Sequence, residues 1–257
     1  MPFTLAHPAA VLPLHRHWRS GLLPLAIGSV APDIPYFLPH RVALALPSGH
    51  TLWGALTISA PLAALMLLIV VLLREPLTAP LWGRHRVLAA RAIEAFRRDP
   101  WNWVAAVPAM LLGIGLHILW DSFTHRNGWI VAHVAEFEAN VSPLPRFPLE
   151  LFRALQYLSS VGGLAVIAVW YRRRLGSVAA PAPASPTVSH GARMLALALV
   201  AAAAIASGGL AALRAAPRYG SFHGTTYLTT TAAISAAVVT YVIVGCVLAL
   251  RESWRQP

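Results

Sequence analysis

Lysine is absent from this sequence of 257 residues, cysteine occurs once, at Cys246, and charged residues make up only 11% of the chain. A single cysteine excludes a disulfide framework within the chain, so cysteine usage does not indicate the redox compartment. Soluble globular domains carry about 25% charged residues, so this chain has too few to cover a surface that faces water. The low charge therefore favours a protein that is embedded in a membrane.

Long apolar runs accompany this scarcity of charge, because hydrophobic residues make up 57% of the chain. Roughly 20 apolar residues cross a bilayer as a helix, whereas a lone strand would leave its backbone polar groups unpaired in lipid. The sequence therefore predicts an all-α fold, a polytopic membrane helical bundle of about five spans. The expected spans are residues 53–73, 104–120, 155–171, 194–213 and 226–250.

The segment before the first span, residues 22–38, is apolar enough for a sixth span but is interrupted by three prolines. We expect instead a re-entrant or short helical hairpin, with one arm at residues 6–14, a turn at 16–21 and a second arm that ends at Pro32. An arm of about ten residues is about 15 Å long. That length is about half of the hydrocarbon core.

A segment rich in Pro, Ala and Ser, GSVAAPAPASPTVS at residues 176–189, has no apolar face. It separates a part rich in His and Asp from a last pair of helices whose small residues allow close packing in lipid. We expect a helical membrane domain at 1–173, a linker loop at 174–193 and a C-terminal pair of transmembrane helices at 194–257.

The net charge of +11 comes entirely from arginines, which lie in the segments between apolar runs rather than on one domain. This distribution argues against a nucleic-acid partner and is typical of the loops that orient membrane proteins. In the five-span arrangement one side carries eight arginines and the other twelve. The richer side holds the linker and the C-terminus, so we expect both in the cytoplasm.

The segment GLHILWDSFTHRNG places a carboxylate, Asp121, inside an apolar stretch. Ionisable residues in a span are costly and usually functional. On a helix His117, Asp121 and His125 form one stripe, and neighbours in this stripe could share a metal ion. The two histidines lie about 12 Å apart along the axis, so one of them would lie outside that ion's ligands. The alternative is a buried His–Asp pair that supports packing.

Three further residues could join this stripe. Asp33 lies in GSVAPDIPYF, where the two prolines predict extended backbone, although the aspartate could also only cap a turn. His50 follows Ser48, a candidate N-cap of the first span, and His7 begins the first hairpin arm. In the hairpin arrangement all of them lie on the membrane face where the second span ends.

Imidazoles combined with carboxylates are ligands suited to a divalent metal, Zn, with Mn or Fe(II) as alternatives. Because thiolates are absent from these segments, an open catalytic site is more natural than a closed structural zinc site.

Four segments carry a resemblance: MPFTLAHPAAVLPL, GSVAPDIPYF, SGHTLWG and HILWDSFTHRNGW. To about residue 160 the chain resembles an uncharacterised family of bacterial integral membrane proteins. A sparser pattern within these segments is an N-terminal His, then Pro-Asp, then a His at a helix start and then HxxxD. This pattern is similar to that of bacterial inner-membrane metal-dependent hydrolases, which are distant relatives of zinc-dependent phospholipase C. The resemblance implies that the metal ligands are His7, Asp33, His50, His117 and Asp121. The hydrolases have a second acidic residue after Pro-Asp, where this chain has Pro35, so one expected carboxylate is missing.

These observations predict a membrane-embedded metal-dependent hydrolase in the bacterial inner membrane, with its site on the outer face. The substrate would be a lipid or a lipid-linked molecule, and the resemblance implies a phosphoester. Asp121 and His125 are the candidate catalytic residues, while Arg41 and Arg126 could hold a phosphate. Two alternatives stay open: an intramembrane amidase, such as the ceramidases, and a transporter or assembly factor that uses His and Asp for ion binding or proton relay.

Overall fold

A computed structural model describes most of the chain and contains five helices that are long and apolar enough to cross a membrane. The expected all-α bundle of five spans is therefore confirmed. The spans are Leu52–Leu72, Trp101–Thr124, Leu151–Gly176, His190–Ala215 and Gly224–Ser253. The described residues are 4–38, 42, 46, 48–144, 146, 148–179, 188–219 and 222–254, so residues 180–187, in the middle of the expected linker at 174–193, lie outside them.

The chain forms two compact units. The first comprises Met1–Pro35, Leu44–Leu68 and Phe96–Arg173, and the second comprises Tyr36–Ala43, Ile69–Ala95 and Arg174–Pro257. Residues 69–95, which the sequence analysis assigns to the first domain, thus belong to the unit that contains the C-terminal helices.

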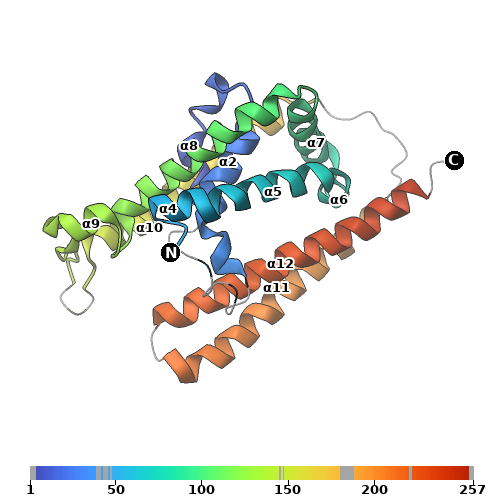
Figure 1. Cartoon of the computed structure of the whole chain (residues 1–257). Helices are drawn as coiled ribbons and strands as arrows, with labels where there is room; N and C mark the ends of the chain where they lie inside the picture. Colours follow the sequence, from blue (N-terminus) through green and yellow to red (C-terminus); the bar gives the residue numbers. More distant parts are fainter. Residues whose placement is uncertain are drawn as a thin grey trace. The chain divides into compact units, whose positions relative to one another are not determined.

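The first unit begins with short helices: η1 (Thr4–Ala6), α1 (Pro8–Val11), η2 (His15–His17), α2 (Leu22–Val30) and η3 (Ala31–Phe37). Helices α1 and α2 pack on each other and on α8 (Trp101–Thr124), as expected of a short hairpin (Figure 1). Val11, Leu25 and Ala109 are fully buried where the three helices meet. The first arm is shorter than expected, because the α-helix ends at Val11.

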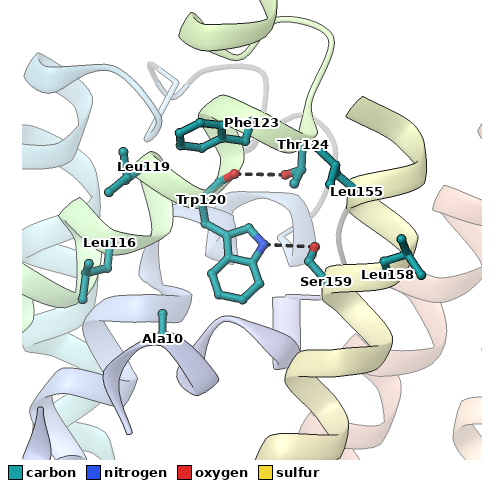
Figure 2. Close-up of a pocket in the computed structure, with 9 residues that line it drawn as sticks. All are labelled: Ala10, Leu116, Leu119, Trp120, Phe123, Thr124, Leu155, Leu158 and Ser159. Carbon is teal, nitrogen blue, oxygen red and sulfur yellow. Dashed lines mark hydrogen bonds between the residues drawn. The ribbon is translucent and has the colours of Figure 1, made fainter. Parts of the chain in front are cut away.

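The first span is built from three consecutive pieces, α4 (Leu52–Gly54), a π-helical turn η4 (Ala55–Ser59) and α5 (Ala60–Leu72). After α8 come two short helices, α9 (Trp129–His133) and η5 (Ala135–Glu138), and then α10 (Leu151–Gly176). Helices α8 and α10 are joined by a hydrogen bond in which Trp120 Nε1 donates to Ser159 Oγ at 3.2 Å (Figure 2).

Large apolar side chains cover the outer faces of the spans. Leu158 on α10 is 70% exposed, and Leu65 on α5 and Leu119 on α8 are more than half exposed. In water such a surface would be costly, but in a bilayer it contacts lipid tails while the helices satisfy their own backbone groups. The exposed apolar surface therefore agrees with the membrane location.

The second unit contains α6 (Arg74–Thr78), α7 (Gly83–Arg97), α11 (His190–Tyr219) and α12 (Phe222–Ser253). Helices α11 and α12 run side by side, joined by a hydrogen bond from Ser207 Oγ to the carbonyl of Ala232 at 3.2 Å (Figure 1). Residues 74–98, an arginine-rich segment between the first two spans that we expected to be a loop, instead contain α6 and α7. The Arg86 guanidinium donates to both oxygens of Glu252, at 2.7 and 2.6 Å.

Candidate metal centre

The site begins with a close approach between α2 and α8. A Cβ atom at Gly28 would overlap the backbone of Met110, and one at Gly113 would overlap the carbonyl of Leu25. Two glycines facing each other's helix therefore let the backbones come together, as small residues do in membrane helices. This approach brings the carbonyl oxygen of Ser29 within 2.7 Å of His117 Nδ1.

The contact with Ser29 fixes the state of the His117 ring. A carbonyl oxygen can only accept, so Nδ1 carries the hydrogen and, in the neutral ring, Nε2 presents a lone pair. Metal-binding histidines are usually held in this way, with one nitrogen on a backbone carbonyl or a carboxylate and the other on the ion. His117 is 1% exposed, so its Nε2 lone pair faces the protein interior.

Asp33 enters the site from η3, directly after α2. The prediction of extended backbone here is wrong, because Ala31, before the first proline, is helical with φ −59° and ψ −38°, and η3 continues through both prolines. A proline's fixed φ is compatible with a helical turn, although Pro35, which lies inside η3, cannot donate a backbone hydrogen bond there. Thr4 Oγ1 donates to Asp33 Oδ2 at 2.6 Å, while the other oxygen, Oδ1, faces the histidines.

A cap at Ser48 would place His50 in the first turn of the first span, but His50 precedes that span. The N-cap is Thr51, whose side chain accepts from the amide of Gly54 at 3.0 Å, so the expected cap at Ser48 is replaced. Ser59 lies nine residues after His50, at the end of the π-helical turn. Its buried Oγ donates to the carbonyl of Gly49 at 3.1 Å. Such π-helical turns are frequent at functional sites, and this one supports the loop that carries His50.

Asp121 lies one turn after His117 on α8 and has histidine nitrogens around both of its oxygens. Its Oδ2 is 3.3 Å from Nε2 of His117 and 3.3 Å from Nε2 of His50. Its Oδ1 is 3.0 Å from Nε2 of His7 and 3.3 Å from Nδ1 of His125. The Asp121 carboxylate therefore contacts two histidines, His117 and His50, through Oδ2 and the other two through Oδ1.

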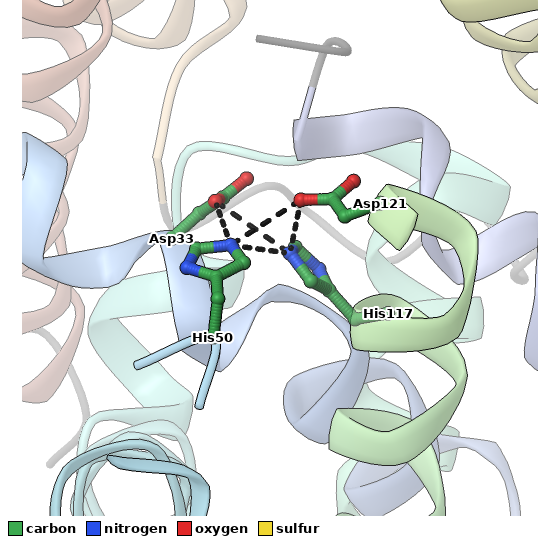
Figure 3. Close-up of side chains that lie close together, drawn as sticks. All are labelled: Asp33, His50, His117 and Asp121. Atoms are coloured by element: carbon green, nitrogen blue, oxygen red, sulfur yellow. Dashed lines mark hydrogen bonds and ion pairs between the residues drawn. The ribbon is translucent and has the colours of Figure 1, made fainter. Parts of the chain in front are cut away.

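Four side chains meet at one point: Asp33, His50, His117 and Asp121 each offer a ligand atom within 4.8 Å of the other three (Figure 3). The two Nε2 atoms are 3.2 Å apart, and Asp33 Oδ1 lies 3.3 Å from that of His50 and 3.6 Å from that of His117. Metal–ligand bonds of about 2.0–2.2 Å in a tetrahedron separate neighbouring ligands by about 3.3–3.6 Å. The cluster can therefore hold a divalent metal ion.

The charge of the cluster also favours a bound cation. Asp33 is 2% exposed and Asp121 is 6% exposed, and two carboxylates buried together require a compensating cation. Burial alone would lower the pKa of His50, but its hydrogen bonds with Asp121 and Asp33 outweigh burial and raise that pKa above its ordinary value of 6.5. A metal ion would compete with this proton for the same carboxylates.

His7, which the resemblance implies as a fifth ligand, lies beside the group of four described above. Its Nδ1 is 3.2 Å from the carbonyl of Thr4, and its Nε2 contacts Asp121 Oδ1 rather than the oxygen that faces the cluster. The ring is stacked on that of His117, with centroids 3.9 Å apart. In this arrangement His7 holds Asp121 in place, which is a common role of residues around a metal site.

His125, the C-cap of α8, lies at the edge of the cluster, with its side chain 28% exposed. The predicted phosphate ligands are less well placed. Arg126 is 63% exposed and pairs with Glu150 at 3.1 Å, and Arg41 lies outside the described residues. The phosphate-binding role of both arginines stays a prediction.

The supporting residues Thr4, Ser29, Ser59 and Gly113 were missed by sequence reasoning. A hydroxyl that donates to Asp33, or a carbonyl that accepts from His117, comes from a residue type that occurs throughout the chain. Only the pair Gly28 and Gly113 carried a weak signal, since glycine in an apolar helix often marks a close contact.

The sequence matches the model of one protein family over residues 1–252, a family described as a domain of unknown function (DUF4184). The chain belongs to this family. The expected membership of an uncharacterised family is thereby confirmed, and the match includes every residue of the cluster. No curated protein and no solved structure matches the chain, so the argument for function rests on the geometry of the site.

Proposed function

We propose that this chain is a membrane-embedded metal-dependent hydrolase that acts on a lipid or lipid-linked phosphoester. The observation that carries the proposal is the spacing of the four ligand atoms, 3.2–3.6 Å in the five pairs whose distances are given above. Asp33, His50, His117 and Asp121 would hold one ion, Zn or alternatively Mn or Fe(II). Such an ion lowers the pKa of a bound water toward neutrality and polarises the bond to be cleaved.

The protein's own residues would position the metal ligands and transfer a proton. His7 and Thr4 hold the two carboxylates from behind, through Asp121 Oδ1 and Asp33 Oδ2. Hydrolysis of a phosphoester leaves the hydroxyl of water on phosphorus and transfers a proton to the departing oxygen. His125 is suited to carry that proton, because it is partly exposed and lies outside the four ligands.

Membrane depth favours a lipid substrate. Asp121 lies three residues before the end of α8, which is about 4.5 Å along the helix axis. The cluster would then lie near the boundary between headgroups and acyl chains, where a lipid phosphoester is found. A soluble substrate would need no such depth.

The arginine distribution supports an orientation with the site on the outer face of a bacterial inner membrane and the C-terminus in the cytoplasm. Reporter fusions after Arg174 and after Pro257 test it. A cytoplasmic readout at both positions is expected, and an external readout at both would reverse the orientation.

Metal analysis of the purified protein tests the proposal directly. We expect about one equivalent of metal in the wild-type protein, loss of this metal in Asp121→Ala, and retention in the matched control His133→Ala. His133 lies on α9 and its Nδ1 bonds to the backbone of Trp129, away from the ligand atoms. Metal-dependent release of glycerol phosphate from phosphatidylglycerol vesicles would support the phosphoester, whereas fatty-acid release from ceramide would favour an amidase. Equal metal in Asp121→Ala would overturn the proposed centre.

A further inference from the structure

An open groove of about 630 Å³ runs along the first unit between α8 and α10 (Figure 2). Leu116, Leu119 and Phe123 line it from α8, and Leu155 and Leu158 line it from α10. Its size lies within the range of about 300–1,000 Å³ that is usual for ligand sites. The lining is almost wholly apolar, so the groove is suited to a hydrocarbon.

The groove lies on the face of α8 next to the face that carries His117 and Asp121. Its lining residues Leu116, Trp120 and Thr124 each precede a residue of the His117–Asp121–His125 stripe. The Trp120 indole, held by its hydrogen bond to Ser159, lies 6.0 Å from the His7 ring, centroid to centroid. Thr124 Oγ1 is 3.4 Å from Nδ1 of His125. A molecule in the groove would therefore have one end beside the cluster.

The length of the groove corresponds to one leaflet. On α8 it extends from Leu116 to Thr124, the last residue of the helix, which is about 12 Å of helix rise. Half of the hydrocarbon core is about 15 Å thick. Leu119 is 54% exposed and Leu158 is 70% exposed, so the groove opens toward the acyl chains of the bilayer, from which a lipid can enter sideways.

We infer that this groove holds one acyl chain of the substrate, so that the bond next to the headgroup lies at the depth of Asp121 and His125. This inference rests on the proposed function of the metal centre. It narrows the substrate class to membrane lipids with at least one hydrocarbon chain, drawn from the leaflet on the side of the site. A headgroup without a chain would not be held.

Photolabelling tests the inference with the full-length protein in nanodiscs of phosphatidylethanolamine and phosphatidylglycerol. A phosphatidylglycerol with a diazirine on one chain is included, and the labelled peptides are identified by mass spectrometry. Labels are expected at residues 116–124 and 155–159. Ser159→Phe or Leu155→Trp, which fill the groove from α10, should reduce them about tenfold. The control Leu164→Trp, on the same helix but outside the groove lining, should leave them unchanged.

Competition in the wild-type protein requires no variant. An unlabelled single-chain lysophosphatidylglycerol should reduce labelling of the groove, whereas glycerol 3-phosphate should not. Labels spread over all spans in proportion to exposure, and insensitive to Ser159→Phe and Leu155→Trp, would mean surrounding bilayer lipid only and would overturn the inference. Metal content is measured on the same samples. If the protein contains metal but the groove is not labelled, the inference about the groove is contradicted and the metal centre is not. If the groove is labelled but the protein contains no metal, the result supports lipid binding in the groove and contradicts the proposed hydrolase.

Discussion

Nδ1 of His117 donates to the carbonyl oxygen of Ser29 at 2.7 Å, and this bond couples the metal centre to the packing of two helices. Ser29 lies near the end of α2, four residues before Asp33, while Asp121 lies four residues after His117 on α8. One interhelical contact therefore fixes the tautomer of a histidine and also sets the separation of the two carboxylates. The site depends on how closely α2 and α8 approach.

The close approach gives the first prediction. Gly113→Val should force α8 away from Leu25 and weaken metal binding about 10- to 100-fold, as loss of a supporting contact does at other metal sites. Gly115→Val is the matched control, because nothing lies within 4 Å of a Cβ atom at Gly115. Titration with Zn²⁺ against a chromophoric chelator measures both. Equal affinity in the two variants would mean that helix spacing does not set the site.

The π-helical turn of the first span gives the second prediction. Ser59→Ala removes the buried hydrogen bond to Gly49 and should loosen the loop that carries His50, so metal affinity should fall about tenfold. Thr57→Val is the control, since the hydroxyl of Thr57 is exposed and donates to the carbonyl of Trp53 in the same span. The same chelator titration applies. If both variants bind alike, the turn has no part in positioning His50.

His125 gives the third prediction, which separates binding from turnover. His125→Asn should keep the bound metal and lose about 10²- to 10⁴-fold in rate of lipid phosphoester hydrolysis, the usual value of a proton-transfer group. His133→Asn should keep both metal and rate. Metal analysis beside an assay of glycerol phosphate released from phosphatidylglycerol gives the two readouts. Loss of metal in His125→Asn would instead make this histidine a ligand.

The fourth prediction concerns pH. The pKa of His50 is raised above 6.5 in the metal-free protein, so the folded state binds this proton more tightly than the unfolded state. The resulting stability is present below pH 6.5 and is lost as the pH rises through the raised pKa. Metal binding has the opposite dependence, because a ligand imidazole must be neutral. Zn²⁺ affinity should therefore rise from pH about 6 to about 8. His50→Gln removes a proposed ligand and should both weaken binding and reduce this pH dependence, whereas constant wild-type affinity would contradict the prediction.

The five spans were predictable because lipid leaves a chain few choices. A run of about 20 apolar residues must be helical to satisfy its backbone, and the structure places every expected span. Helix α7 was missed because it is amphipathic and rich in arginine. Its stability depends on partners such as Glu252, 166 residues away in the sequence, and no local pattern reveals such a pair.

The cluster residues were predictable for a related reason. A carboxylate such as Asp121 stands out in an apolar run, and hairpin topology alone brings Asp33 and His50 to the same face. The sequence could not show which of His7 and His117 faces the cluster as a ligand and which one holds Asp121. The two rings stack on each other, and only the positions of individual nitrogen atoms separate the one that faces the cluster from the one that holds Asp121.

The contact between Asp33 and the histidines has a consequence for biogenesis. Asp33 is synthesised 88 residues before Asp121, which is an interval of about 4–18 seconds at about 5–20 residues per second. For most of that time His50 has already been synthesised, but the N-terminal hairpin carries this carboxylate without His117 and Asp121, and an ionised carboxylate that lacks its partners is costly in lipid. We therefore expect the hairpin to stay at the membrane surface until α8 has been synthesised, so that insertion of the first segment is completed by a later one.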